Sequence, residues 1–213
     1  MSWAYDGHDI GLRLFTEALK AGAPMTVTPG MRVLEVGCCE ADWLGLAHTA
    51  WPDVTLIGID TQATDDADST GTVTRMRADV LNPGLFAPMS LDAVVSISTI
   101  EHVGLGHYGD PVAAIGDSRA LWNIRTWLKP GGWLYFDVPY SSDEYRVLGT
   151  EYRVYDEPAV TTRLCRGLGV TGQRLWVDRW RGYADCHGTV MPDPIAWDTR
   201  RVECYAAMVW TKE

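Results

Sequence analysis

The chain has 213 residues, of which 46% are hydrophobic and 22% charged, a composition typical of a soluble globular protein with room for one α/β domain and a sizeable core. The formal net charge of −10 argues against a nucleic acid as the main partner, because binding a phosphate backbone requires clustered Lys and Arg. No apolar run approaches the length of a membrane span, so we expect neither nucleic acid nor membrane among the partners.

The cysteines and the N-terminus bear on the cellular compartment. Five cysteines, an odd number that includes the adjacent Cys38 and Cys39, indicate reduced thiols rather than a disulfide framework. No two of them have the CxxC spacing of a structural zinc site, and we predict no bound metal. The N-terminus carries Asp6, His8 and Asp9 where a signal peptide needs a basic and then an apolar region, which favours a cytoplasmic protein.

The first predicted element is an amphipathic helix over residues 9–21, in which apolar residues recur every fourth position from Ile10 to Ala18. We expect residues 1–30 to form a helical cover over a core of residues 31–213, the two together making a single domain.

The next stretch predicts a strand that turns tightly into a helix. Residues 32–37 are a buried strand by their apolar run, which leads into Gly37, and an amphipathic run over 42–50 predicts the helix. The backbone N–H groups of a first helical turn have no partners within the helix. In a parallel sheet they face the crevice beyond the strand ends, so this turn is a predicted ligand site.

Apolar or alternating runs predict six further strands, over residues 54–59, 73–80, 91–98, 133–138, 173–180 and 203–211. Residues 61–72 predict an exposed loop, and Asp110 and Pro111 predict the N-cap and first position of a helix that ends at Lys129. A further helix is predicted near 157–168. The last two strands are joined directly, so we predict an α/β fold with a seven-stranded, mostly parallel sheet, an antiparallel C-terminal hairpin and helices on both faces.

A dinucleotide is disfavoured at the first turn. The fingerprint GxGxxG places its second and third glycines at Cys39 and Asp42. Glu40 and Asp42 flank the helix start, and a pyrophosphate about 4 Å from one carboxylate meets a repulsion of roughly 4 kcal/mol per charge pair at an effective dielectric near 20. A cationic or zwitterionic ligand avoids this repulsion.

Over residues 31–211 the chain resembles the class I S-adenosylmethionine-dependent methyltransferases, which have a Rossmann-like fold. Their first motif consists of an acidic residue, a hydrophobic residue and GxGxG. Glu35 and Gly37 match its acid and first glycine, whereas Cys39 and Ala41 stand where glycines are usual. The cofactor implied by the resemblance is S-adenosylmethionine, which carries a sulfonium and no phosphate.

Further landmarks follow in the family's order. Asp60 matches the residue whose carboxylate holds both ribose hydroxyls, and Asp79 looks like the acceptor for the adenine amino group. LDAVVS at 91–96 resembles the family's fourth strand, and LKPGGW at 128–133 resembles its turn before the fifth. The cofactor-binding residues implied by the resemblance are Glu35, Gly37, Cys38, Cys39, Asp60, Thr61, Asp79, Val80 and Ser96.

The glycine-rich string EHVGLGHYGDP after the fourth strand opens on the same crevice and looks like that of an uncharacterised branch of the family. Its Glu101–His102 pair occurs in many small-molecule members, and His102 has the titration range of a general base near neutral pH. We predict Glu101 and His102 as catalytic residues and His107, Tyr108 and Tyr140 as substrate contacts. The alternative is that Glu101 and His102 only cap and pack the loop.

Three functions remain in competition. The leading hypothesis is an enzyme that transfers a methyl group from S-adenosylmethionine to an oxygen or nitrogen atom of a small molecule. The altered glycine turn motivates a second, a non-catalytic S-adenosylmethionine-binding module or pseudoenzyme. The third, a NAD-dependent oxidoreductase, is disfavoured by the acidic turn. Neither the substrate nor the oligomeric state follows from the sequence.

Overall fold

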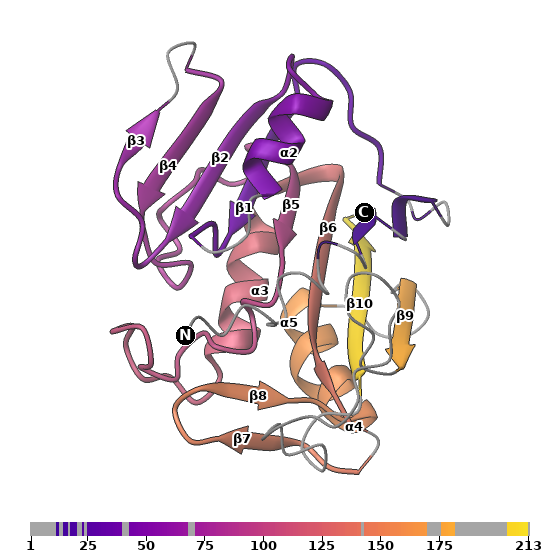
Figure 1. The fold of residues 1–213 in the computed structure, drawn as a ribbon. Helices are drawn as coiled ribbons and strands as arrows, with labels where there is room; N and C mark the ends of the chain where they lie inside the picture. The colour runs from indigo at the N-terminus through magenta and orange to yellow at the C-terminus, as the bar shows by residue number, and fades with distance from the viewer. Residues whose placement is uncertain are drawn as a thin grey trace, which may run out of the picture.

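The computed structural model describes residues 12, 15–16, 18–20, 23, 25–39, 43–67, 71–141, 143–169, 176–181 and 204–212. An eight-stranded sheet forms the centre of the molecule, with the strand order β3-β4-β2-β1-β5-β6-β10-β9 (Figure 1). Its strands are β1 (Arg32–Val36), β2 (Thr55–Asp60), β3 (Asp66–Ala67), β4 (Val73–Arg77), β5 (Leu91–Ser96), β6 (Leu128–Tyr140), β9 (Trp176–Arg181) and β10 (Cys204–Thr211).

The direction of the strands confirms the predicted fold class. The neighbours β4, β2, β1, β5 and β6 run parallel, whereas β10 pairs antiparallel with both β6 and β9. The prediction of seven strands omitted β3, a two-residue strand that pairs antiparallel with β4 at the edge of the sheet. This strand lies within residues 61–72, which the sequence predicts as a loop. It also omitted a separate hairpin of β7 (Arg146–Leu148) and β8 (Tyr152–Val154).

Helices cover both faces of the sheet, as predicted. One face packs against α2 (Trp43–Ala50) and against Phe15, whose ring meets those of Trp43 and Tyr135 edge-on at 5.7 and 5.0 Å. The other face packs against α3 (Gly116–Trp127) and a continuous helical segment that contains a π-helical turn. This segment comprises α4 (Glu157–Ala159), η1 (Val160–Cys165) and α5 (Arg166–Leu168).

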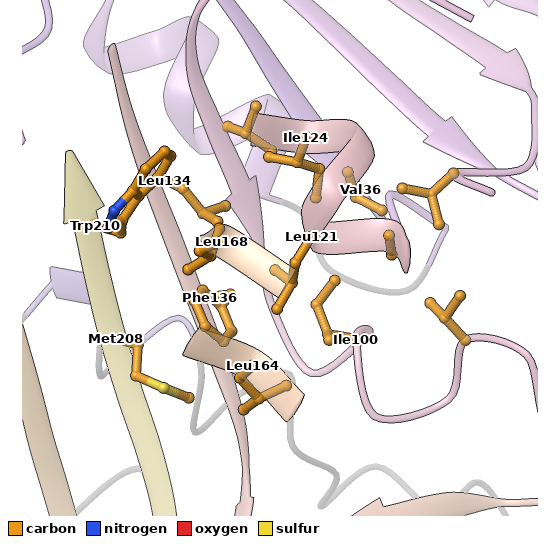
Figure 2. Packing of buried hydrophobic residues seen from close by; sticks show 14 of the residues in the cluster. Val36, Ile100, Leu121, Ile124, Leu134, Phe136, Leu164, Leu168, Met208 and Trp210 are labelled. Carbon is orange, nitrogen blue, oxygen red and sulfur yellow. The ribbon is translucent and has the colours of Figure 1, made fainter. Parts of the chain in front are cut away.

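Burial explains why these elements assemble. Figure 2 shows apolar side chains of α3 and of the 157–168 segment facing those of β6 and β10. Each fully buried aliphatic or aromatic side chain of this kind stabilises the fold by about 1.5–3 kcal/mol relative to exposure. The fully buried members of this interface include Leu121, Ile124, Leu134, Phe136, Leu164 and Met208.

Strand register places the ends of the parallel strands side by side. Val36 of β1 pairs with Ile59 of β2, and Asp60 pairs with Arg77 of β4. The residues that follow β1, β2, β4 and β5 therefore meet at one edge of the sheet, where parallel α/β folds bind ligands.

Two predicted boundaries are wrong. Helix α3 begins at Gly116, with Ile115 as its N-cap, and not at Pro111 after an Asp110 cap. Strand β6 begins at Leu128 and not at Trp133, and the turn predicted at 128–133 lies within it as an irregularity, where Leu91 pairs with Leu128 but Ala93 pairs with Trp133. In the part of the chain that the structure describes, no helix is long and apolar enough to cross a membrane.

Candidate active site

A cleft lies at the carboxyl ends of β1, β2, β4 and β5 and encloses about 720 Å³, the open space at its mouth included. Its lining consists of Val36, Gly37, Cys39, Ile59, Asp60, Thr61, Gln62, Ala78, Asp79, Val80, Ser98, Thr99, His102, Val103, Tyr108 and Asp110.

The turn after β1 requires glycine at position 37. Gly37 has a φ of +87°, and a Cβ added there would lie 2.0 Å from Oγ1 of Thr99. The backbone N–H groups of Gly37 and Cys38 both donate to the carbonyl of Ile59, at 2.8 and 3.4 Å. The turn is thus held against β2 and lies against Thr99 in the loop after β5.

The adjacent cysteines have different surroundings. Cys38 is buried, and its Sγ would lie 2.8 Å from a Cβ added at Gly58, so its side chain fills the space over that glycine. Burial, followed by the nearby carboxylate of Glu35, raises the pKa of the Cys38 thiol to about 12. Cys39 is exposed and lines the cleft. Only Cys39 is therefore placed to touch a ligand.

Asp60 is the last residue of β2, Asp79 lies two residues after the adjacent parallel strand β4, and each shapes the turn that carries it. One carboxylate oxygen of Asp60 accepts from the N–H of Gln62 at 2.7 Å, and one of Asp79 accepts from the N–H of Leu81 at 2.8 Å. Both side chains are partly exposed toward the cleft that they line. The turns therefore present two carboxylates to one ligand.

The charged side chains in the described lining are all acidic. It contains three carboxylates, those of Asp60, Asp79 and Asp110, and neither lysine nor arginine. A phosphate-bearing ligand would meet repulsion here, whereas a cation would be attracted. Glu40 and Asp42, on which the sequence-based argument against pyrophosphate rests, lie outside the described residues, as does Ala41.

The loop that follows β5 forms one wall of the cleft and contains three glycines with positive φ, Gly104, Gly106 and Gly109. Asp110 closes this loop, because its Oδ2 accepts from the N–H of Gly104 at 2.6 Å. Nε2 of Gln62 donates to the carbonyl of Tyr108 at 2.6 Å and so connects the loop to the turn after β2.

The hydrogen bonds of His102 determine its tautomer. Nδ1 lies 2.5 Å from the carbonyl oxygen of Glu151, and because a carbonyl only accepts, the hydrogen is on Nδ1. In the neutral ring Nε2 then has the lone pair, and it lies 3.8 Å from Oε1 of Glu101. The ring of Tyr108 meets that of His102 edge-on at 5.6 Å. This arrangement suits a proton acceptor whose cation a carboxylate would stabilise.

Glu101 lies behind the cleft and belongs to a buried polar group. Its Oε1 accepts from Oγ of Ser98 at 2.8 Å, and the N–H of Ser98 donates to Oδ1 of Asp137 at 3.0 Å. Burial, followed by the charge of Glu101, raises the pKa of Asp137 well above its usual range. Ser98 has a φ of +44°, an uncommon conformation for a residue with a side chain. The two buried carboxyl groups thus meet through one serine.

The structure brings together most of the predicted site residues and separates the others from the cleft. The predicted residues that line it are Gly37, Cys39, Asp60, Thr61, Asp79, Val80, His102 and Tyr108. Outside the lining, Glu35, Cys38, Ser96 and Glu101 are buried in or beside the sheet, and Tyr140 lies in the hydrophobic core. His107 is exposed on the loop, with its ring 4.7 Å from that of Tyr108.

Sequence reasoning missed several residues of the lining. Ser98 ends the strand predicted over residues 91–98 and Thr99 follows it, so the rule that parallel strand ends share one edge could have found them. Gln62 and Asp110 gave no such signal, because their roles depend on contacts within folded loops. Among the described residues, no group of three or more His, Cys, Asp or Glu side chains is arranged to hold a metal ion.

Comparison of the sequence with protein families finds a match to only part of the chain. Residues 85–162 match the model of a family described as "Caenorhabditis protein of unknown function, DUF268". A search of curated proteins finds no match. The matched segment includes β5, the loop that follows it, α3, β6 and the β7–β8 hairpin.

Comparison with solved structures finds similar proteins over most of the chain. The Burkholderia thailandensis 1,6-didemethyltoxoflavin-N1-methyltransferase, solved with 1,6-didemethyltoxoflavin and S-adenosylhomocysteine, is similar with a TM-score of 0.60 and 14% identity, over 97% of this chain and 79% of that one. An S-adenosylmethionine-dependent methyltransferase from Archaeoglobus fulgidus is similar with a TM-score of 0.59 and 13% identity, over 94% of each chain. The 16S rRNA (adenine(1408)-N(1))-methyltransferase from Catenulisporales acidiphilia, a D21A mutant, is similar with a TM-score of 0.53 and 15% identity, over 92% of each chain. The chain thus has the methyltransferase fold.

Proposed function

We propose that this chain is an S-adenosylmethionine-dependent methyltransferase whose cofactor binds in the cleft. The observation that carries the proposal is the convergence of Asp60, Asp79 and the turn at Gly37 on one cleft with no lysine or arginine in its described lining. Similar structures solved with S-adenosylhomocysteine support the choice of cofactor.

The residues of the cleft fit the parts of this cofactor. By the family resemblance, Asp60 accepts hydrogen bonds from the two ribose hydroxyls and Asp79 accepts one from the adenine amino group. The net negative charge of the described lining suits the positive charge of a sulfonium. A pyrophosphate fits none of these features, which disfavours a NAD-dependent oxidoreductase.

Bound S-adenosylmethionine supplies an electrophilic methyl group for an in-line displacement. The chain's own part is to align the substrate, to exclude water and, where the nucleophile is protonated, to remove a proton. We assign proton removal to Nε2 of His102, since Nδ1 is committed to the carbonyl of Glu151. The carboxylate of Glu101, 3.8 Å from Nε2, then stabilises the imidazolium.

For the substrate we propose an oxygen or nitrogen atom of a small molecule. The net charge of −10 and the methyltransferase that binds 1,6-didemethyltoxoflavin support this class. The similar rRNA methyltransferase makes a nucleic acid the competing substrate. Cys39, in a usual glycine position of the turn, motivates the competing reading as a binding module without turnover. Turnover on a panel of amines and phenols would decide against the module.

Isothermal titration calorimetry with S-adenosylmethionine, S-adenosylhomocysteine and NAD tests the proposal. We expect the first two to bind with one site per chain and NAD to show no heat of binding. The Asp60→Ala variant should lose at least about tenfold in affinity, because a hydrogen bond to a charged group contributes roughly 1.5–3 kcal/mol. The His102→Ala variant should bind like the parent. Absence of binding by both sulfur compounds would refute the proposal.

A further inference from the structure

A second buried polar cluster lies behind the loop that follows β5 and is separate from the cleft. Its centre is Asp117 of α3, which is fully buried. Tyr155 donates its hydroxyl to Oδ2 of Asp117 at 2.9 Å, and Arg163 donates to both carboxylate oxygens at 2.8 Å. A second guanidinium, that of Arg153, approaches the same carboxylate with its Nε 3.8 Å from Oδ2. One carboxylate thus faces two arginines.

The two terminal nitrogens of Arg153, in β8, face backbone carbonyls of the loop that follows β5. Its side chain is 1% exposed, and one terminal nitrogen donates to the carbonyl of Glu101 at 3.1 Å and to that of Val103 at 2.7 Å. The other terminal nitrogen lies 3.5 Å from the carbonyl of Ala113, and the backbone N–H of Arg153 also donates to Glu101 at 3.1 Å. These carbonyls stand on both sides of His102 and at the far end of the loop.

The backbone of the loop is packed closely enough for one side chain to reach both ends. A Cβ added at Gly104 would lie 2.6 Å from the carbonyl oxygen of Ala113, and one added at Gly116 would lie 2.4 Å from that of Val103. Two glycines therefore let the beginning of the loop touch the beginning of α3. The carbonyl groups that this contact brings together are the ones that Arg153 binds.

We infer that Arg153 is the positioning residue for the loop that carries His102, a role that rests on the proposed function of that loop. The β7–β8 hairpin lies next to this loop in Figure 1 and holds His102 through both its backbone neighbours and its ring. Arg153 holds the carbonyls on either side of the residue, and the carbonyl of Glu151 holds its ring nitrogen. A guanidinium suits this task because it offers five donors in a fixed plane, and Asp117 compensates its buried charge.

The experiment compares three variants by NMR without any cofactor. Arg153→Met removes the guanidinium at similar length, and Arg153→Lys keeps the charge beside Asp117 but cannot serve three carbonyls. The control, Arg163→Met, removes the other arginine of Asp117. Arg163 binds neither Glu101 nor Val103, but it donates to the carbonyl of Ala114 at 2.7 Å, so the two variants are compared at His102 and Gly104. Two quantities are measured: amide hydrogen exchange, and the tautomer of the His102 ring from its nitrogen and carbon shifts.

In Arg153→Met the amides of His102, Gly104 and Ala113 should exchange at least about tenfold faster relative to those of α3, because local opening becomes easier. The His102 ring should lose its single Nδ1–H tautomer. Arg153→Lys should show a smaller change of the same kind. Arg163→Met should leave the relative exchange of His102 and Gly104 and the tautomer as in the parent.

Three results would overturn the inference. The first is a folded Arg153→Met variant with the loop exchange and the tautomer of the parent. The second is an equal change in Arg163→Met, and the third is loss of folding in both Arg153 variants, since either would make Arg153 a residue of general stability. Calorimetry with S-adenosylhomocysteine on the same parent sample keeps the two proposals apart. A parent that does not bind it refutes the proposed cofactor and leaves the NMR result on Arg153 valid.

Discussion

The carboxylates of Asp60 and Asp79 each have two roles, one in the backbone turn that carries them and one in the lining of the cleft. Each accepts one hydrogen bond from a backbone N–H two residues further along the chain, which fixes its own turn. Each also faces the cleft. Their positions were predicted from the resemblance to the methyltransferase family, whose order of landmarks has an acid at the end of each of these two strands. The same resemblance predicts Thr61, and it predicts Gly37 together with the turn from strand to helix.

Gly37→Ala should distort the cleft. The new Cβ would clash with Thr99, and the φ of +87° disfavours a side chain by about 1–2 kcal/mol. We expect a lower melting temperature in calorimetry and at least about tenfold weaker binding of S-adenosylhomocysteine. The control is Gly84→Ala, where the nearest atom would be 3.6 Å away. Equal behaviour of the two variants would contradict the assigned role of Gly37.

At the scale of elements, apolar runs correctly predict the parallel strands and both faces of helices. Apolar runs fail to predict elements that are too short to show a hydrophobic pattern. Strand β3 consists of Asp66 and Ala67, and the β7–β8 hairpin has three residues in each strand. The start of α3 was misplaced because Asp110 and Pro111 look like a helix start, whereas Asp110 instead accepts a hydrogen bond inside the loop.

The loop after β5 shows why parts of the site escape sequence reasoning. Gln62 reaches a carbonyl 46 residues away, at Tyr108, and Arg153 reaches one 50 residues away, at Val103. Neither contact follows from spacing or composition, because each depends on two segments whose relative position the whole fold determines. His102 was predicted, but the residues that orient it were not.

Gln62→Ala should loosen the loop over the cleft. It removes the 2.6 Å hydrogen bond to Tyr108, and a bond of this kind contributes about 1 kcal/mol, or roughly fivefold in an equilibrium. Stopped-flow measurements should show S-adenosylhomocysteine dissociating several times faster. Thr64→Ala, at an exposed position outside the lining, serves as the control. Dissociation at the parent rate in Gln62→Ala would mean that this bond does not hold the loop closed.

At the scale of the whole molecule, the buried carboxyl groups should determine part of the pH dependence of stability. The pKa of Asp137 is raised in the folded state, so the folded chain binds a proton more tightly than the unfolded chain does. The free energy of unfolding should therefore fall as the pH rises above the unfolded value of about 4, by at most about 1.4 kcal/mol per pH unit for this group.

Asp137→Asn removes this titration and keeps an oxygen for the N–H of Ser98. Urea unfolding between pH 4 and 8 should give a variant whose stability, relative to the parent, increases with pH. Asp143→Asn, at an exposed position, should follow the parent. Parallel curves for Asp137→Asn and the parent would show that the carboxyl group ionises in the folded chain as it does in the unfolded one.

The central claim is that S-adenosylmethionine binds in the cleft between Gly37, Asp60 and Asp79. A crystal structure of the protein grown with saturating S-adenosylhomocysteine tests it most directly. We predict that both ribose hydroxyls lie within hydrogen-bond distance of the carboxylate of Asp60 and that the adenine amino group lies beside Asp79. Electron density for the ligand at another place, or an empty cleft in crystals that diffract well, would contradict the account.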